Sequence, residues 1–176
     1  MRSAILVGLA AALVAGAAAA QPFAFVPNEK SGTVSIIDTT KDAVVGEIKA
    51  GEKPRGIAVS PDGKTLYVSD QPARALLVID VAKKAVVEKI QLGESPEGVG
   101  ISADGKWVVA AVEESNTVAF IDTTTNKVVV NLKVAGKNPE HAVFSPDLKW
   151  LYVSAEEGDV VDVIDARNRK QVTSVK

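Results

Sequence analysis

The single histidine of the chain, His141, is the residue best suited to acid–base or metal chemistry. An imidazole can bind a divalent metal or take up a proton near neutral pH, and the carboxylate of Glu140 stands directly before it. One histidine in a chain with no cysteine nevertheless offers a metal few ligands. We therefore expect His141 to make a structural or partner contact, with metal binding and base catalysis as the alternatives.

Other signatures of enzymes are absent from the sequence. It holds no G-x-S-x-G nucleophile elbow, no P-loop, no H-E-x-x-H helix and no glycine-rich dinucleotide turn. The absence of cysteine excludes disulfides, thiolate nucleophiles and covalently attached c-type haem. We predict no catalytic residues and no bound cofactor, and we favour a binding protein over an enzyme.

The first twenty residues have the pattern of a cleaved export signal. A short basic start with Arg2 precedes an apolar stretch at 4–16 and an A-x-A site at 18–20. The apolar stretch is shorter than the roughly 20 residues that span a bilayer. We expect residues 1–20 to be removed in the periplasm, leaving Gln21 as the mature N-terminus, with a membrane anchor as the alternative.

The mature chain, 21–176, is slightly acidic. Without Arg2 it has 19 basic and 22 acidic residues, which gives a formal charge of −3. Such a chain has no general attraction for a polyanion, so its charge argues against non-specific binding of nucleic acid.

A repeat of 42 or 43 residues organises the mature chain. The segment PRGIAVSPDGK at 54–64 returns as PEGVGISADGK at 96–106 and as PEHAVFSPDLK at 139–149. An Ile-Asp pair also recurs, with its aspartates at Asp38, Asp80, Asp122 and Asp165. Because these aspartates stand once in every unit before turn-forming residues, we assign them to turns rather than to catalysis.

Each unit contains four short runs rich in Val, Ile, Leu and Tyr, separated by turn-forming residues. Four antiparallel strands in about 40 to 45 residues are typical of a β-propeller blade. We therefore predict an all-β propeller, with a different solenoid as the alternative. The strands of a blade are named a to d from the centre outward.

The Pro-Asp-Gly-Lys segment predicts the turn between strands a and b. Its proline presets φ, its aspartate bonds nearby backbone, and its glycine can take a positive φ. Leu148 replaces the glycine in the last copy, so we expect that turn to be strained or differently shaped.

The repeat resembles a known family. Tyr67-Val68-Ser69-Asp70 and Tyr152-Val153-Ser154-Ala155, with the Ile-Asp strand and the Ser-Pro-Asp-Gly turn, are similar to the YVTN-type β-propeller repeat over residues 23–176. The segments GESPEG at 93–98, GKNPEH at 136–141 and VSAEE at 153–157 resemble the propellers linked to PQQ-dependent alcohol catabolism. This resemblance implies a propeller that is accessory to a quinoprotein system.

The predicted blades lie at about 23–50, 54–92, 96–134 and 139–176, and the first supplies only strands b, c and d. That makes about three and three-quarter blades, whereas complete members of the resembled family are rings of about seven. An open arc exposes apolar blade faces and strand edges. We expect a fragment of a longer product, with self-association of two arcs and a strained four-blade ring as alternatives.

Blade topology separates two rims. The a–b and c–d turns form the turn rim, whose sequence repeats almost unchanged from blade to blade. The d–a and b–c loops form the loop rim, whose sequence varies. Variation at equivalent positions of a repeated scaffold points to function. The loop-rim candidates for binding a cation or a basic partner are Arg55, Glu97, Glu113, Glu114, Glu140, His141, Glu156 and Glu157. The alternative is that these are solvated loop charges.

Three functions follow as hypotheses. The first is an exported periplasmic binding or scaffold protein, accessory to PQQ-dependent alcohol oxidation, with a quinoprotein dehydrogenase, a cytochrome or a small ligand at the channel mouth. The second is a lactonase-like hydrolase with its site at that mouth. The third is single-stranded nucleic-acid binding, which some YVTN-type relatives show but which needs a basic, aromatic groove.

Overall fold

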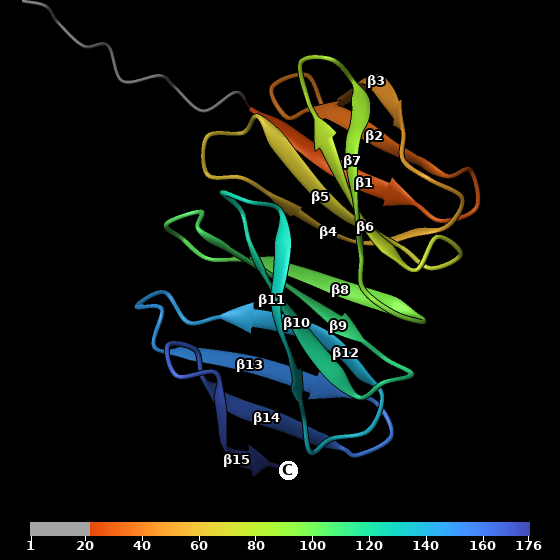
Figure 1. Cartoon of the computed structure of the whole chain (residues 1–176). Coiled ribbons are helices and arrows are strands. Elements are labelled where there is room, and N and C mark those ends of the chain that lie inside the picture. Colours follow the sequence, from red (N-terminus) through yellow and green to blue (C-terminus); the bar gives the residue numbers. More distant parts are fainter. Residues whose placement is uncertain (1–21) are drawn as a thin grey trace, which may run out of the picture.

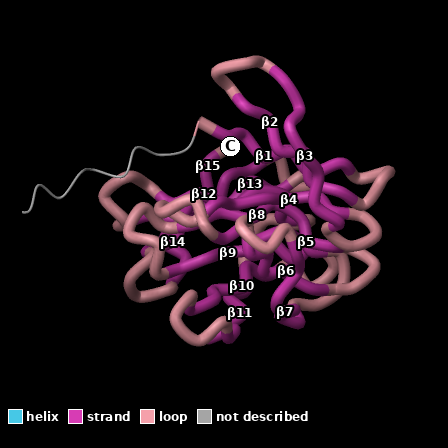
Figure 2. Tube along the Cα trace, turned by 90° about the horizontal axis from the view of Figure 1, so that it is seen from above, coloured by secondary structure: helices cyan, strands magenta, loops and turns pink. Residues whose placement is uncertain are grey.

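The computed structural model describes residues 22–176, and the predicted export signal at 1–20 lies outside them. The described part of the chain consists of fifteen β-strands joined by short loops (Figure 2). It contains no helix long and apolar enough to cross a membrane. Hydrogen bonding divides the strands into four antiparallel sheets, one of three strands and three of four.

The sheets follow one another along the chain, and each forms one blade. Blade 1 comprises β1 (Phe23–Asn28), β2 (Thr33–Asp38) and β3 (Ala43–Lys49). Blade 2 comprises β4 (Pro54–Val59), β5 (Thr65–Asp70), β6 (Ala75–Asp80) and β7 (Ala85–Gln91). Blade 3 comprises β8 (Pro96–Ile101), β9 (Trp107–Val112), β10 (Thr117–Asp122) and β11 (Lys127–Lys133). Blade 4 comprises β12 (Pro139–Phe144), β13 (Trp150–Ala155), β14 (Val160–Asp165) and β15 (Lys170–Val175).

The blades stack side by side in an arc that does not close (Figure 1). The orange blade 1 and the blue blade 4 lie at opposite ends of the stack, and their sheets share no hydrogen-bonded strands. The prediction of an all-β, incomplete propeller is therefore confirmed.

Apolar side chains between neighbouring blades form the core. Leu66 and Val68 of blade 2 pack against Val34 and Ile48 of blade 1, and comparable clusters fill the next two interfaces. A blade is a thin sheet that cannot cover its own faces, so each interface depends on both partners.

The outer face of blade 4 shows what happens without a neighbour. Tyr67 of blade 2 is 5% exposed, whereas Tyr152, at the equivalent position of blade 4, is 41% exposed. On the same face, Val143 and Val175 are more than half exposed. This face is an uncovered copy of the surface that blades 2 and 3 bury.

Close approach of the innermost strands depends on glycine. A Cβ on Gly98 of β8 would overlap the carbonyl oxygen of Glu140 in β12, and a Cβ on Gly100 would overlap that of Ala142. Because the obstructing atoms belong to backbone, they cannot move aside as a flexible side chain could. These contacts bring the first residues of neighbouring inner strands together at the loop rim.

The turn-rim aspartates act as predicted. Asp38, for example, accepts hydrogen bonds from the Thr40 backbone N–H at 2.9 Å and from Lys41 Nζ at 2.7 Å. The bonds from Lys41 and Thr40 lower the pKa of Asp38 from 3.8 to about 2. Leu148 keeps the shape of the a–b turn, with a φ of 59° against 71° for Gly63 and Gly105. The strain expected in this turn therefore arises because Leu148 adopts a left-handed backbone conformation.

Candidate functional site

The loop rim places two series of equivalent residues beside each other. The first series is the second residue of each complete inner strand: Arg55 in β4, Glu97 in β8 and Glu140 in β12. The second series opens the b–c loops: Glu29, Gln71, Glu113 and Glu156. Contacts between the series run from the b–c loops of blades 1, 2 and 3 to the inner strand of the following blade, and Glu156 lies beside Glu140 of its own blade.

At one end of the rim, positive and negative charges balance. Arg55 lies 2.9 Å from Glu97 and 3.6 Å from Glu29, measured between guanidinium nitrogens and carboxylate oxygens. The side chain of Glu97 is only 3% exposed, and it also accepts hydrogen bonds from Gln71 Nε2 and, at 3.3 Å, from Ser95 Oγ. These donors satisfy the oxygens of a carboxylate that is withdrawn from water.

Ser95 connects this balanced end to an acidic one. Its hydroxyl lies 2.7 Å from a carboxylate oxygen of Glu113, as well as within hydrogen-bond distance of Glu97. A hydroxyl has one proton, so Ser95 donates to one of the two carboxylates at a time.

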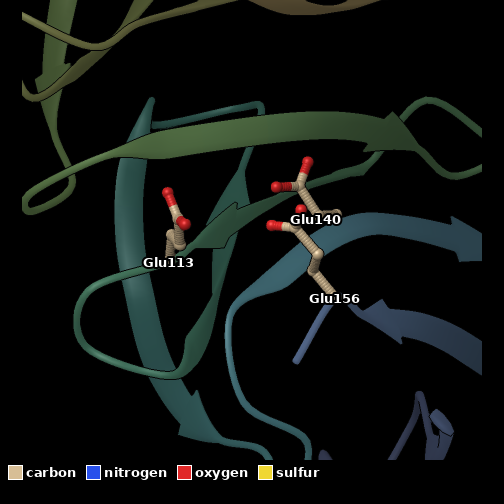
Figure 3. Close-up of side chains that lie close together, drawn as sticks. All are labelled: Glu113, Glu140 and Glu156. Carbon is tan, nitrogen blue, oxygen red and sulfur yellow. The ribbon is translucent and has the colours of Figure 1, made fainter. Parts of the chain in front are cut away.

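Three carboxylates converge at the acidic end of the rim (Figure 3). One oxygen each from Glu113, Glu140 and Glu156 lies within 4.8 Å of the others. Glu113 and Glu140 are half-buried and Glu156 is exposed. We call these three residues the acidic triad. They come from the b–c loops of blades 3 and 4 and from β12, so the stacking of two blades assembles them.

The acidic triad carries an excess of negative charge. Burial raises the pKa of Glu140, and the charges of Glu97, Glu156 and Glu113 add to the increase, while Arg55 opposes it. Within residues 22–176, no lysine or arginine forms an ion pair with a carboxylate of the triad. Three oxygen ligands at this spacing could hold a hard divalent cation, or the ammonium or guanidinium group of a partner.

The remaining predicted residues lie near the triad without joining it. Glu114 and Glu157 are exposed neighbours in the same b–c loops. His141 is exposed, its backbone N–H donates to Ser154 Oγ at 3.2 Å, and its ring carbon Cδ2 lies against Gly98. Among the described residues, the imidazole belongs to no group of three or more candidate metal ligands.

Sequence reasoning missed Ser95 and gave Gln71 no role. Both residues stand at positions that differ from blade to blade: Lys53 and Asn138 are the equivalents of Ser95. That variation is the signal that could have identified them. Their function depends on hydrogen bonds to Glu97 that cross from one blade to the next.

Comparison with known proteins agrees with this architecture. A solved structure named Kuenenia stuttgartiensis Hydrazine Synthase superposes with a TM-score of 0.82 and is 29% identical, over 87% of this chain and 45% of that one. The chain thus spans less than half the length of that structure. No curated protein matches it. A sequence model of the YNCE-like beta-propeller family matches residues 1–103, more than half of the chain. The chain is a β-propeller scaffold or binding protein, and it belongs to the YNCE-like beta-propeller family.

Proposed function

We propose that this chain is an exported periplasmic binding protein whose acidic triad holds a basic surface of a partner in PQQ-dependent alcohol oxidation. The observation that carries the proposal is the convergence of Glu113, Glu140 and Glu156 without a compensating cation from the described chain. A lysine or arginine of a partner would supply that charge.

Electrostatics explains why binding would be favourable at this point. The triad is partly withdrawn from water, so its mutual repulsion is less screened than repulsion between fully exposed charges. An incoming ammonium or guanidinium group relieves the repulsion and gains charge-assisted hydrogen bonds. Opposite charges across the interface also speed the encounter and set the orientation of the partner.

The cellular location and the kind of partner are inferred from the sequence. The signal pattern at 1–20 supports export to the periplasm. The resemblance of 93–98 and 136–141 to propellers of PQQ-dependent alcohol catabolism supports a quinoprotein dehydrogenase or a cytochrome as the partner. The solved relative is named as a synthase, which supports an association with an enzyme. The triad repels phosphate groups, so we do not extend the proposal to nucleic acid.

Capture of partners from a periplasmic extract tests the proposal. The extract comes from bacteria grown on an alcohol, and the bait is wild-type protein or the triple variant E113Q/E140Q/E156Q. We expect the wild type to retain a dehydrogenase or a c-type cytochrome that the triple variant loses. The matched control, D42N/D62N/D147N, removes three exposed carboxylates of the turn rim and should capture like the wild type. Equal capture by both triple variants would disprove the role of the triad.

A further inference from the structure

A pocket of about 530 Å³ opens on the turn rim, between blades 2 and 3. Its lining combines apolar and polar side chains, among them Lys64, Tyr67, Val78, Asp80, Thr123 and Asn126. The volume lies within the range of sites for small molecules. The pocket is made of turn-rim residues, so it is separate from the acidic triad on the loop rim.

The equivalent place between blades 3 and 4 is occupied by an arginine of the chain itself. The guanidinium carbon of Arg169 lies 4.4 Å from the ring centre of Trp107 and 5.8 Å from that of Phe120, distances typical of cation–π contacts. Arg169 also acts on Asp122, whose pKa is lowered first by bonds from Thr124 and further by the Arg169 charge. A planar cation therefore fits this position between blades.

Smaller residues at the equivalent positions leave the space between blades 2 and 3 open. Trp107 corresponds to Thr65, and Arg169 corresponds to Asn126. Phe120 likewise corresponds to Val78. All three replacements remove side-chain volume from the same place, and Thr65, Val78 and Asn126 all line the pocket.

The groups that favour a cation are kept in the open pocket. Asp80 stands where Asp122 does and lies 3.1 Å from Lys83 of its own turn, and the aromatic ring of Tyr67 replaces Val109. Glu88 lies next to the lining residue Asn126, and its carboxylate accepts a hydrogen bond from Asn126 Nδ2 at 2.6 Å. Lys64 also lines the pocket, and its ammonium lies 4.0 Å from the carboxylate of Asp62, which offsets its charge.

The first interface also supports a cation at this position. Lys84 is its equivalent of Asn126, and the Lys84 ammonium lies 3.2 Å from where a Cβ on Gly46 would be. Glu88 is the blade 2 equivalent of Gly46. Asn126 therefore brings a neutral amide to a place where both other interfaces have a cation. Its Oδ1, shielded from solvent, has no hydrogen-bond partner in the described part of the chain.

We propose that the pocket between blades 2 and 3 binds a compound that carries a guanidinium group. The group would lie where Arg169 lies in the next interface, near the Tyr67 ring and the carboxylates of Asp80 and Glu88. The planar, delocalised guanidinium suits an aromatic and carboxylate lining better than a compact ammonium does.

Calorimetric titration of the purified protein with agmatine tests the proposal, and 1,4-diaminobutane serves as the ammonium control. We expect agmatine to bind at one site and diaminobutane to bind about tenfold more weakly. The tripeptide Gly-Arg-Gly shows where the guanidinium group comes from. If the tripeptide binds, the site also accepts arginine side chains of a partner. If it does not bind, the site accepts free small molecules alone. No binding of agmatine, or equal binding of diaminobutane, would overturn the proposal.

Asn126→Arg fills the pocket from within and should abolish agmatine binding. The turn accepts this change, since Arg169 and Lys84 have φ values of 53° and 52° against 52° for Asn126. Thr125→Arg adds the same charge to the same turn outside the pocket lining and should leave binding unchanged. Asp80→Asn should weaken binding severalfold, whereas Asp165→Asn, its equivalent in blade 4, should not. Full binding by both Asn126→Arg and Asp80→Asn would also overturn the proposal.

Discussion

The guanidinium of Arg55 lies 2.9 Å from the carboxylate of Glu97, and this pair joins the inner strands of blades 2 and 3 at the loop rim. Glu97 is buried, whereas about a third of the Arg55 side chain is exposed. The pair therefore neutralises a carboxylate that water cannot solvate. It also fixes the boundary between the balanced and the acidic ends of the rim.

Arg55→Ala should lower the free energy of unfolding by about 2 kcal/mol, because it leaves the buried Glu97 charge without its cation. Urea unfolding at neutral pH measures the loss. Adding Glu97→Gln should restore much of the stability, since the amide oxygen still accepts from Gln71. As a control, Glu94→Ala breaks the exposed pair with Arg74 and should cost less than about 0.5 kcal/mol. If Arg55→Ala proved as mild as the control, the buried pair would have no stabilising role.

Leu148→Gly should raise the free energy of unfolding by about 1 kcal/mol. Leucine at a φ of 59° strains the a–b turn of blade 4, and glycine adopts this backbone without steric strain. The reverse change, Gly63→Leu in blade 2, should destabilise by a similar amount. Unchanged or reduced stability of Leu148→Gly would show that its side-chain contacts outweigh the strain.

The raised pKa of Glu140 predicts the sign of a pH effect. Between its ordinary value of 4.5 and the higher folded value, the folded state binds more protons than the unfolded state. The contribution of Glu140 to stability therefore falls as the pH rises through this window. Glu140→Gln should remove that dependence and raise stability at pH 7 by less than about 1 kcal/mol. The free energy of unfolding is measured between pH 4 and pH 7 for both proteins. If it changed with pH in the same way for wild type and Glu140→Gln, the prediction would be wrong.

The fold could be predicted because the repeat encodes it locally. Asp38 and its equivalents bond the backbone of their own turns, and alternating apolar residues such as Leu66 and Val68 face the preceding blade. Each unit specifies its strands and turns, and stacking follows from the need to cover apolar faces. The assignment of loops to a shared rim required no further information.

The site could be predicted only in part, because it depends on contacts between blades. Glu113 reaches Ser95 and Glu140, while its neighbour Glu114 lies outside the triad. Which of two adjacent glutamates turns inward depends on loop geometry that composition does not specify.

The pocket on the turn rim was missed for a related reason. The turns themselves repeat, so the sequence indicates a purely structural role for that rim. The differences that open the pocket, Thr65 against Trp107 and Asn126 against Arg169, matter only once two blades are placed side by side.

The salt dependence of partner binding tests the role of the acidic triad most directly. The affinity of the captured dehydrogenase or cytochrome is measured for wild type and for E113Q/E140Q/E156Q over a series of salt concentrations. We expect the variant to bind about tenfold more weakly at low salt and to show a shallower decline as salt increases, since its rim no longer attracts a basic surface. Equal affinities with equal salt slopes would contradict the account.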